Sequence, residues 1–295
     1  MNRDPVQLLE PAKRSRAAAK MPLPAYVKAS LACHAGAAGS ALVLPSAWPW
    51  ALGAVVANHL VLAGAGLWPR STWLGRNWTR LPAAATARRE IAITIDDGPD
   101  AEVTPAVLDL LDAHGVRATF FAIATAAARQ PALCREIVRR GHSVQNHSDR
   151  HSHRFSLLGP RAMARELGAA QARLADITGI APRFFRAPAG LRNPFLAPLL
   201  ERLDLQLVSW TRRGFDTVRS EPERVLARLA TGLGAGDILL LHDGNAARTA
   251  AGQPVVLDVL PALLERCKAA GLRAVTLPAA FDATSDGTLP GAAPA

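Results

Sequence analysis

Strand-like and helix-like segments alternate along this chain from about residue 90 onward, and this alternation is the strongest constraint on its fold. The strand-like segments span residues 91–95, 117–123, 142–145, 183–186, 205–210, 237–242 and 273–277. Strands that alternate with helices usually run parallel in one sheet. About seven such units fit a closed sheet better than an open one. The sequence therefore predicts an α/β fold, a distorted (β/α) barrel of about seven strands.

The first predicted strand ends on two adjacent carboxylates. Residues 91–95 place isoleucine at every second position, and Gly98-Pro99 breaks the run. Asp96 and Asp97 therefore lie where the strand leaves the sheet, and near a buried strand end one of them needs a cation or a cationic side chain to stay ionised. A solvated turn that caps the next helix is the plain alternative, because Asp, Gly and Pro are ordinary turn residues.

A loop with three histidines follows the third predicted strand. His147 and His151 are four residues apart, which places both imidazoles on one face if the loop makes a helical turn. His153, six residues after His147, is a less natural substitute for His151. Such a loop can simply be solvated, but imidazole is the commonest metal-binding side chain. Together with Asp97, the two histidines form a set that fits catalytic zinc and leaves positions for water and substrate.

The N-terminal part of the chain has a different composition. Residues 29–69 contain no Asp, Glu, Lys or Arg, and a turn with two prolines at residues 45–50 divides them into two arms, residues 29–44 and 50–68. A membrane-spanning helix needs about 20 apolar residues, so each arm is near the lower limit. We expect an apolar helical hairpin that precedes the barrel.

The changes in charge and in turn residues along the chain predict five segments. They are a basic N-terminal tail at residues 1–28, a transmembrane helical hairpin at 29–69, a basic linker at 70–89, the catalytic domain at 90–282 and a disordered tail at 283–295.

Membrane association is favoured over a buried hairpin of a soluble protein because Trp48, Trp50 and Trp68 lie at the ends of the second arm. Basic segments flank the hairpin on both sides, so two spanning arms would leave the catalytic domain on the cytoplasmic side of a bacterial-type inner membrane. The three cysteines are far apart in sequence and compatible with a reducing compartment. If only one arm spans, the same domain faces the periplasm.

The charge balance argues against nucleic acid as a partner. Formal net charge is +10, but aromatic residues make up only 5% of the chain and no basic stripe is interleaved with them. An anionic membrane surface fits the positive charge better.

Five short motifs, in this order, resemble those of the polysaccharide deacetylase family, also called the NodB-homology domain or carbohydrate esterase family 4. They are Thr94-Ile-Asp96-Asp97, His147-Ser-Asp-Arg-His151, Arg186-Ala-Pro-Ala-Gly190, Trp210-Thr-Arg-Arg-Gly-Phe-Asp216 and Leu240-Leu-His242. The resemblance covers roughly residues 88–280 and implies the family's metal-dependent barrel.

The resemblance also implies roles for these residues. Asp97, His147 and His151 would hold one divalent metal ion, zinc first, with cobalt, nickel or manganese as alternatives. Asp96 would be the general base that deprotonates the attacking water.

Four further roles follow from the same comparison. Arg186 would orient Asp96 and keep it ionised, although an arginine after a strand can also be a surface residue. His242 would protonate the leaving amine, with Asp216 raising its pKa, although a histidine at a strand end can be purely structural. Ala189 would contribute the oxyanion-binding backbone N–H, while Leu240 and Trp210 would contact substrate.

The chain departs from the family pattern at two motifs. Ala189 stands where the family has an aromatic residue, and Ala187 replaces a proline. Arg213 stands in place of the first Asp of the fourth motif, and Thr217 in place of a Trp. These departures bear most on substrate preference.

The resemblance implies a hydrolase that removes N-acyl groups, N-acetyl first, from an amino-sugar-containing saccharide, polysaccharide or lipid-linked saccharide. Two alternatives use the same residues differently. One is an O-acetyl esterase acting on a polysaccharide. The other is a catalytically silent, membrane-anchored sugar-binding domain, which would leave the intact base, metal set and acid unexplained.

Overall fold

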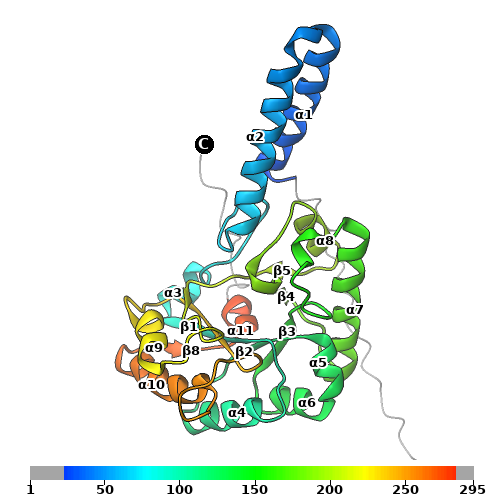
Figure 1. The fold of residues 1–295 in the computed structure, drawn as a ribbon. Helices are drawn as coiled ribbons and strands as arrows, with labels where there is room; N and C mark the ends of the chain where they lie inside the picture. Colours follow the sequence, from blue (N-terminus) through cyan, green and yellow to red (C-terminus); the bar gives the residue numbers. More distant parts are fainter. Residues whose placement is uncertain (1–22, 284–295) are drawn as a thin grey trace, which may run out of the picture.

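The computed structural model describes residues 23–283 of the chain, and within them an apolar hairpin projects from a barrel (Figure 1). Helix α1 (Ala25–Val43) and helix α2 (Trp48–Leu67) lie side by side, joined by the turn η1 (Pro45–Ala47). Both predicted arms are therefore helical. One segment of the described chain, Pro45–Leu67, is long and apolar enough to cross a membrane by length and composition. Most of the predicted basic tail and nearly all of the predicted disordered tail lie outside the described residues.

The barrel consists of parallel strands, which confirms the predicted fold class. Seven strands follow one another in the order β5-β4-β3-β2-β1-β7-β6, and β8 pairs with the start of β1. The strands are β1 (Glu90–Asp96), β2 (Thr119–Ala122), β3 (Ser143–Asn146), β4 (Phe184–Phe185), β5 (Gln206–Leu207), β6 (Arg212–Arg213), β7 (Ile238–His242) and β8 (Arg273–Ala274). Within residues 23–283 the two edge strands β5 and β6 do not pair with each other, so the barrel is open at this seam.

Six helices of seven residues or more follow the strands, in agreement with the predicted alternation. These are α4 (Val103–Ala113), α6 (Pro131–Arg139), α7 (Pro160–Thr178), α8 (Leu196–Arg202), α9 (Pro222–Ala230) and α10 (Val255–Ala269). Three short helices were not predicted: α3 (Ala83–Ala87), α5 (Ala124–Arg129) and α11 (Leu277–Asp282). They have five or six residues each, too few to show a helical period.

Two strand predictions need correction. Strand β6 was missed because its two residues, Arg212 and Arg213, carry no apolar alternation. The predicted strand at 273–277 ends after Ala274, because Thr276 caps helix α11 with its side chain and Pro278 fits the first turn of that helix.

The segment that leaves the hairpin fills the open seam. Trp78 pairs with Val208 beyond β5, and Arg80 pairs with Asp237 just before β7. The backbone N–H of Trp78 donates to the Leu207 carbonyl at 2.9 Å, and the N–H of Leu81 donates to the Gly236 carbonyl at 2.8 Å. Residues 70–89, expected to be a linker, thus pack against the barrel; the division of the chain into separate domains remains a prediction.

Alternate side chains of strand β1 point to opposite faces of the sheet, and one set faces the barrel interior. Its isoleucines pack with residues of helices α4 and α10 in the largest apolar cluster. The intervening positions face the other way, where Ala92 packs beside Phe121. Thr94 and Asp96 continue this inner row and are buried. The strand therefore delivers a carboxylate to the interior at its carboxyl end, where sites of parallel barrels form.

Candidate active site

The two adjacent carboxylates at the end of β1 point to different partners. Asp96 is the last strand residue and faces the barrel interior. Asp97 adopts a left-handed backbone conformation, with φ of 77°, which turns its carboxylate toward the loop after β3. Both side chains are buried, so each needs a compensating positive charge or hydrogen-bond donors.

Asp97 meets the two predicted histidines. Its Oδ1 atom lies 3.2 Å from His147 Nε2 and 3.3 Å from His151 Nε2, and the three ligand-type atoms lie within 4.8 Å of one another. His147 Nδ1 donates to the Arg186 carbonyl at 2.8 Å, which leaves Nε2 as the ring nitrogen that faces Asp97. His153 is exposed and does not belong to this cluster, so His151 rather than His153 is the second imidazole.

The electrostatics of this cluster fit a bound cation. Asp97 Oδ1 is buried and makes no hydrogen bond within residues 23–283. Burial raises the pKa of Asp97, but His147, His242 and His151 outweigh it and hold the pKa below its usual range. Burial lowers the pKa of His147, while Asp96 and Asp97 raise it more. A positive charge between these atoms is therefore favoured, and the two-histidine, one-carboxylate set is a donor set suited to a divalent transition metal.

Arg186 binds the other carboxylate. Its NH1 atom donates to Asp96 Oδ1 at 2.7 Å and to Thr94 Oγ1 at 2.8 Å, and its NH2 atom donates to the Ser209 carbonyl at 2.9 Å. The side chain is only 1% exposed, and its guanidinium stacks on the Phe121 ring with 4.1 Å to the centroid. Burial lowers the pKa of Arg186, and the ion pair with Asp96 opposes this. The pair engages one oxygen of Asp96, and the other, Oδ2, faces the cluster at 3.6 Å from His147 Nε2.

His242 ends strand β7 beside a buried carboxylate. Its Nδ1 atom donates to Asp216 Oδ1 at 2.9 Å, and its backbone N–H donates to Asp216 Oδ2 at 2.7 Å. Burial lowers the pKa of His242, but Asp216, with Asp96 and Asp97 beyond it, raises it above its usual value. The structure thus brings His242 and Asp216 together, although the motif that contains Asp216 departs from the family pattern.

One pocket of about 320 Å³ joins these groups. Arg186 and Asp216 lie behind its wall as supports, while the other predicted site residues line it. Its lining consists of Asp96, Asp97, His147, His151, His153, Ala187, Ala189, Gly190, Trp210, Arg213, Thr217, Leu240, His242 and Asn245. Ala189 is exposed and has a φ of 54°, at the turn that follows β4.

Two site residues were not predicted from the sequence. Asn245 donates from Nδ2 to Asp97 Oδ2 at 3.2 Å, and Asp243 accepts from Thr104 Oγ1 at 2.5 Å. Burial raises the pKa of Asp243 to about 7. Asp243 packs so closely against Gly98 that a Cβ atom could not fit there. Both residues lie within three positions after His242, and a loop after a barrel strand is the signal that could have found them.

Comparisons with known proteins agree with this geometry. The family model for polysaccharide deacetylases matches residues 83–208. A chitooligosaccharide deacetylase from Bradyrhizobium is 36% identical over a match that covers 53% of this chain and 71% of the relative. A peptidoglycan-N-acetylglucosamine deacetylase from Bacillus cereus is 26% identical over 74% of this chain and 78% of the relative.

A solved structure has a similar fold. The family 4 carbohydrate esterase from Streptomyces lividans, in complex with acetate, is 30% identical and superimposes with a TM-score of 0.57, over 63% of this chain and 91% of the esterase. With the fold, the ordered motifs and these relatives in agreement, the chain belongs to the polysaccharide deacetylase family, hydrolases of carbon–nitrogen bonds other than peptide bonds.

Proposed function

We propose that this protein is a metal-dependent deacetylase that removes N-acetyl groups from an amino-sugar-containing saccharide. The observation that carries the proposal is the convergence of Asp97, His147 and His151 in one pocket with Asp96 and His242. Relatives named for chitooligosaccharides and for peptidoglycan support an acetylated amino sugar as the substrate class.

Asp97, His147 and His151 would hold the metal ion, with zinc as the first candidate and cobalt, nickel or manganese as alternatives. When bound, a divalent ion polarises the acyl carbonyl and lowers the pKa of a coordinated water. Asp96 then acts as the general base that removes a proton from the attacking water. Arg186 holds one oxygen of Asp96 at 2.7 Å, so the other oxygen is the one available for proton transfer.

His242 is the proposed general acid. Because Nδ1 is bound to Asp216, Nε2 is the nitrogen that can deliver a proton to the departing amine. The carboxylate of Asp216 raises the pKa of His242, which favours the protonated ring that a general acid needs. Ala189 is the proposed source of the backbone N–H that stabilises the oxyanion, and the buried side chains of Leu240 and Trp210 shape the space for a small acyl group.

Acetate release separates this activity from its alternatives. The metal-loaded chain, assayed in detergent, should release acetate from chitooligosaccharides or peptidoglycan and leave acetylated xylan largely intact. Release from xylan alone would instead indicate an O-acetyl esterase. Binding of saccharide without any release would identify a silent sugar-binding domain.

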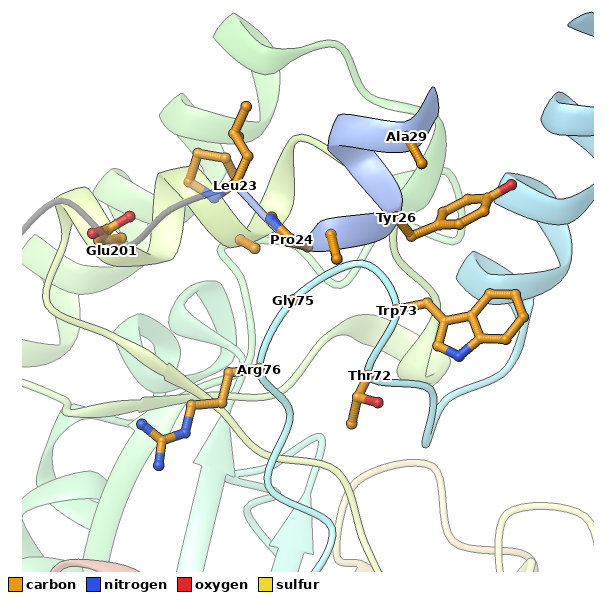
Figure 2. Close-up of a pocket in the computed structure, with 12 residues that line it drawn as sticks. Leu23, Pro24, Tyr26, Ala29, Thr72, Trp73, Gly75, Arg76 and Glu201 are labelled. Atoms are coloured by element: carbon orange, nitrogen blue, oxygen red, sulfur yellow. The ribbon is translucent and has the colours of Figure 1, made fainter. Parts of the chain in front are cut away.

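We further propose that the hairpin anchors the domain in a membrane through residues 29–69. With 19 and 20 residues, α1 and α2 are roughly 28 and 30 Å long, close to the thickness of a bilayer core. Trp48 and Trp50 are exposed at the tip. At the base, a pocket of about 690 Å³ contains Tyr26 and Trp73 with ring centroids 5.5 Å apart (Figure 2). Aromatic residues at both ends fit the two interfaces of a bilayer.

If both arms span, the barrel would lie on the cytoplasmic side, next to the basic flanks, a location that would suit a lipid-linked saccharide at the inner leaflet. A reporter that is active only outside the cytoplasm, fused after Ala295, tests this topology. Silence together with a positive cytoplasmic reporter supports two spans. Strong activity would mean one span and a periplasmic active site.

A further inference from the structure

The active-site pocket contains an arginine that the proposed reaction does not use. Arg213 lies on β6 and lines the same pocket as the candidate metal ligands. Its Nε atom is buried without a hydrogen-bond partner, and no carboxylate within residues 23–283 forms a salt bridge with it. By contrast, Arg186 and Arg212, which lie on the same side of the barrel, are both paired with carboxylates.

Aromatic rings hold Arg213 in place instead of a counter-charge. Its guanidinium carbon lies 4.8 Å from the ring centroid of Phe215 and 5.3 Å from that of Trp210. On the same Phe215 ring, Arg228 stacks at 4.7 Å from outside the pocket. Cation–π contacts orient a guanidinium but leave its charge uncompensated. The ring contacts therefore present a fixed positive charge, and no acceptor among residues 23–283 bonds to its buried Nε donor.

We propose that Arg213 forms a subsite for a phosphate group carried by the saccharide, beside the carbon–nitrogen bond that is cleaved. This rests on the proposed deacetylase function and narrows its substrate class. A guanidinium presents donors in a planar fork that matches phosphate oxygens, and a partly buried charge without a partner is stabilised when such an anion binds. Asp97 and Asp96 are occupied by the histidines and by Arg186, so they do not compete for it.

The wall that carries this subsite is continuous with the base of the hairpin. A Cβ atom on Gly190 would lie 2.6 Å from Pro69 and 2.7 Å from the Trp210 ring, so these three residues are in close contact. Ser209 donates from Oγ to the Pro69 carbonyl at 2.6 Å. Pro69 follows the end of α2 by two residues. A phosphate bound here would thus lie near the membrane segment, as in a sugar joined to a lipid through a phosphate ester.

The test compares the deacetylation of neutral and phosphorylated N-acetylglucosamine substrates by the full, metal-loaded chain in detergent. The substrates are a chitooligosaccharide, N-acetylglucosamine 1-phosphate and polyisoprenyl-phosphate-linked N-acetylglucosamine. Arg213→Gln should lower kcat/KM for the phosphorylated substrates by about 10- to 100-fold relative to the neutral one, the loss expected for a charge-assisted contact. Arg213→Lys should recover part of this loss, whereas Arg228→Gln, which also stacks on Phe215 but does not line the pocket, should behave as wild type.

An equal loss on neutral and phosphorylated substrates, or the same loss in Arg228→Gln, would overturn the subsite. Binding of N-acetylglucosamine 1-phosphate, measured by calorimetry, gives a readout without turnover: Arg213→Gln should weaken it at least tenfold, and unchanged affinity would also overturn the proposal. If wild type binds this probe through Arg213 but releases no acetate from any substrate, the deacetylase function fails and the subsite stands. A higher kcat/KM for the lipid-linked substrate than for the soluble phosphate identifies the lipid as the source.

Discussion

The barrel site and the hairpin both depart from the usual pattern of charged side chains outside and apolar side chains inside, but in different ways. The barrel buries charges, with Arg186 and Asp96 at 1% and 2% exposure. The hairpin exposes apolar groups, with Val43 and Trp50 at 86% and 83% exposure. A buried charge is costly unless a partner compensates for it, and an exposed apolar surface is costly in water unless another molecule covers it. The difference agrees with the proposed function, in which the barrel would bind a cation and a polar substrate and lipid would surround the hairpin.

The inside of the hairpin supports this comparison. Asn58 on α2 donates to Ser30 Oγ on α1 at 2.8 Å and accepts from the Tyr26 hydroxyl at 3.2 Å. Further along, the rings of His34 and His59 meet edge to face with centroids 5.1 Å apart. Polar residues between the helices and apolar residues outside are typical of helices that pack within a membrane.

The largest effect should come from the base. Asp96→Asn keeps the size of the side chain but removes the proton acceptor, so kcat should fall by about 10²- to 10⁴-fold. Metal content, measured by elemental analysis, should stay at the wild-type value. Metal lost together with activity would make Asp96 a ligand instead.

The buried ion pair should have the next largest effect. Arg186→Met leaves Asp96 as an uncompensated buried charge, which costs about 3–5 kcal/mol of unfolding free energy. Arg183 offers a matched control, because its salt bridge with Asp282 is exposed and worth at most about 1 kcal/mol. Denaturant unfolding of both variants checks the difference. Equal destabilisation by Arg183→Met would contradict the contrast between buried and exposed charges.

A charge introduced into the hairpin should weaken membrane insertion and leave catalysis unchanged. Val56 is half exposed in the middle of α2, and Val56→Asp should disfavour membrane insertion by about 2.5–3.5 kcal/mol. The fraction of protein that floats with liposomes should drop, while kcat on a soluble oligosaccharide stays at the wild-type value. Ile180→Asp, at an equally exposed position on the barrel, should change neither. A Val56→Asp protein that still floats fully would mean that lipid does not cover this helix.

The smallest effect concerns a buried polar group away from the site. His142 Nδ1 accepts from the Ala118 N–H at 3.1 Å, and burial lowers the pKa of His142 to about 4. Between pH 6.5, the ordinary pKa of histidine, and pH 4, His142 is protonated in the unfolded chain but stays neutral in the folded barrel. Stability should therefore fall as pH decreases from 6.5 toward 4, by about 1.5 kcal/mol between pH 6.5 and pH 5. His142→Gln should lose this part of the pH dependence, and an unchanged slope would contradict the assignment.

Site residues that stand in a local sequence pattern could be predicted from the sequence. The period of β1 placed Asp96 and Asp97 at a strand end, and the spacing of His147 and His151 identified the second half of the cluster. What the sequence could not show depends on contacts between distant segments. Trp78 pairs with Val208 only because the barrel leaves a seam there, and no local period signals that pairing. The sequence shows that Arg213 departs from the family pattern. It does not show that aromatic rings surround the guanidinium, or that its Nε atom has no hydrogen-bond partner among residues 23–283.

Metal content and acetate release, measured together in one set of preparations, test the central claim most directly. Wild type should bind one equivalent of divalent metal and release acetate from an N-acetylated oligosaccharide. His147→Ala should lose both, whereas His153→Ala, a neighbouring pocket residue outside the cluster, should retain the metal. Full metal occupancy in His147→Ala, or acetate release by a metal-free preparation, would contradict the account.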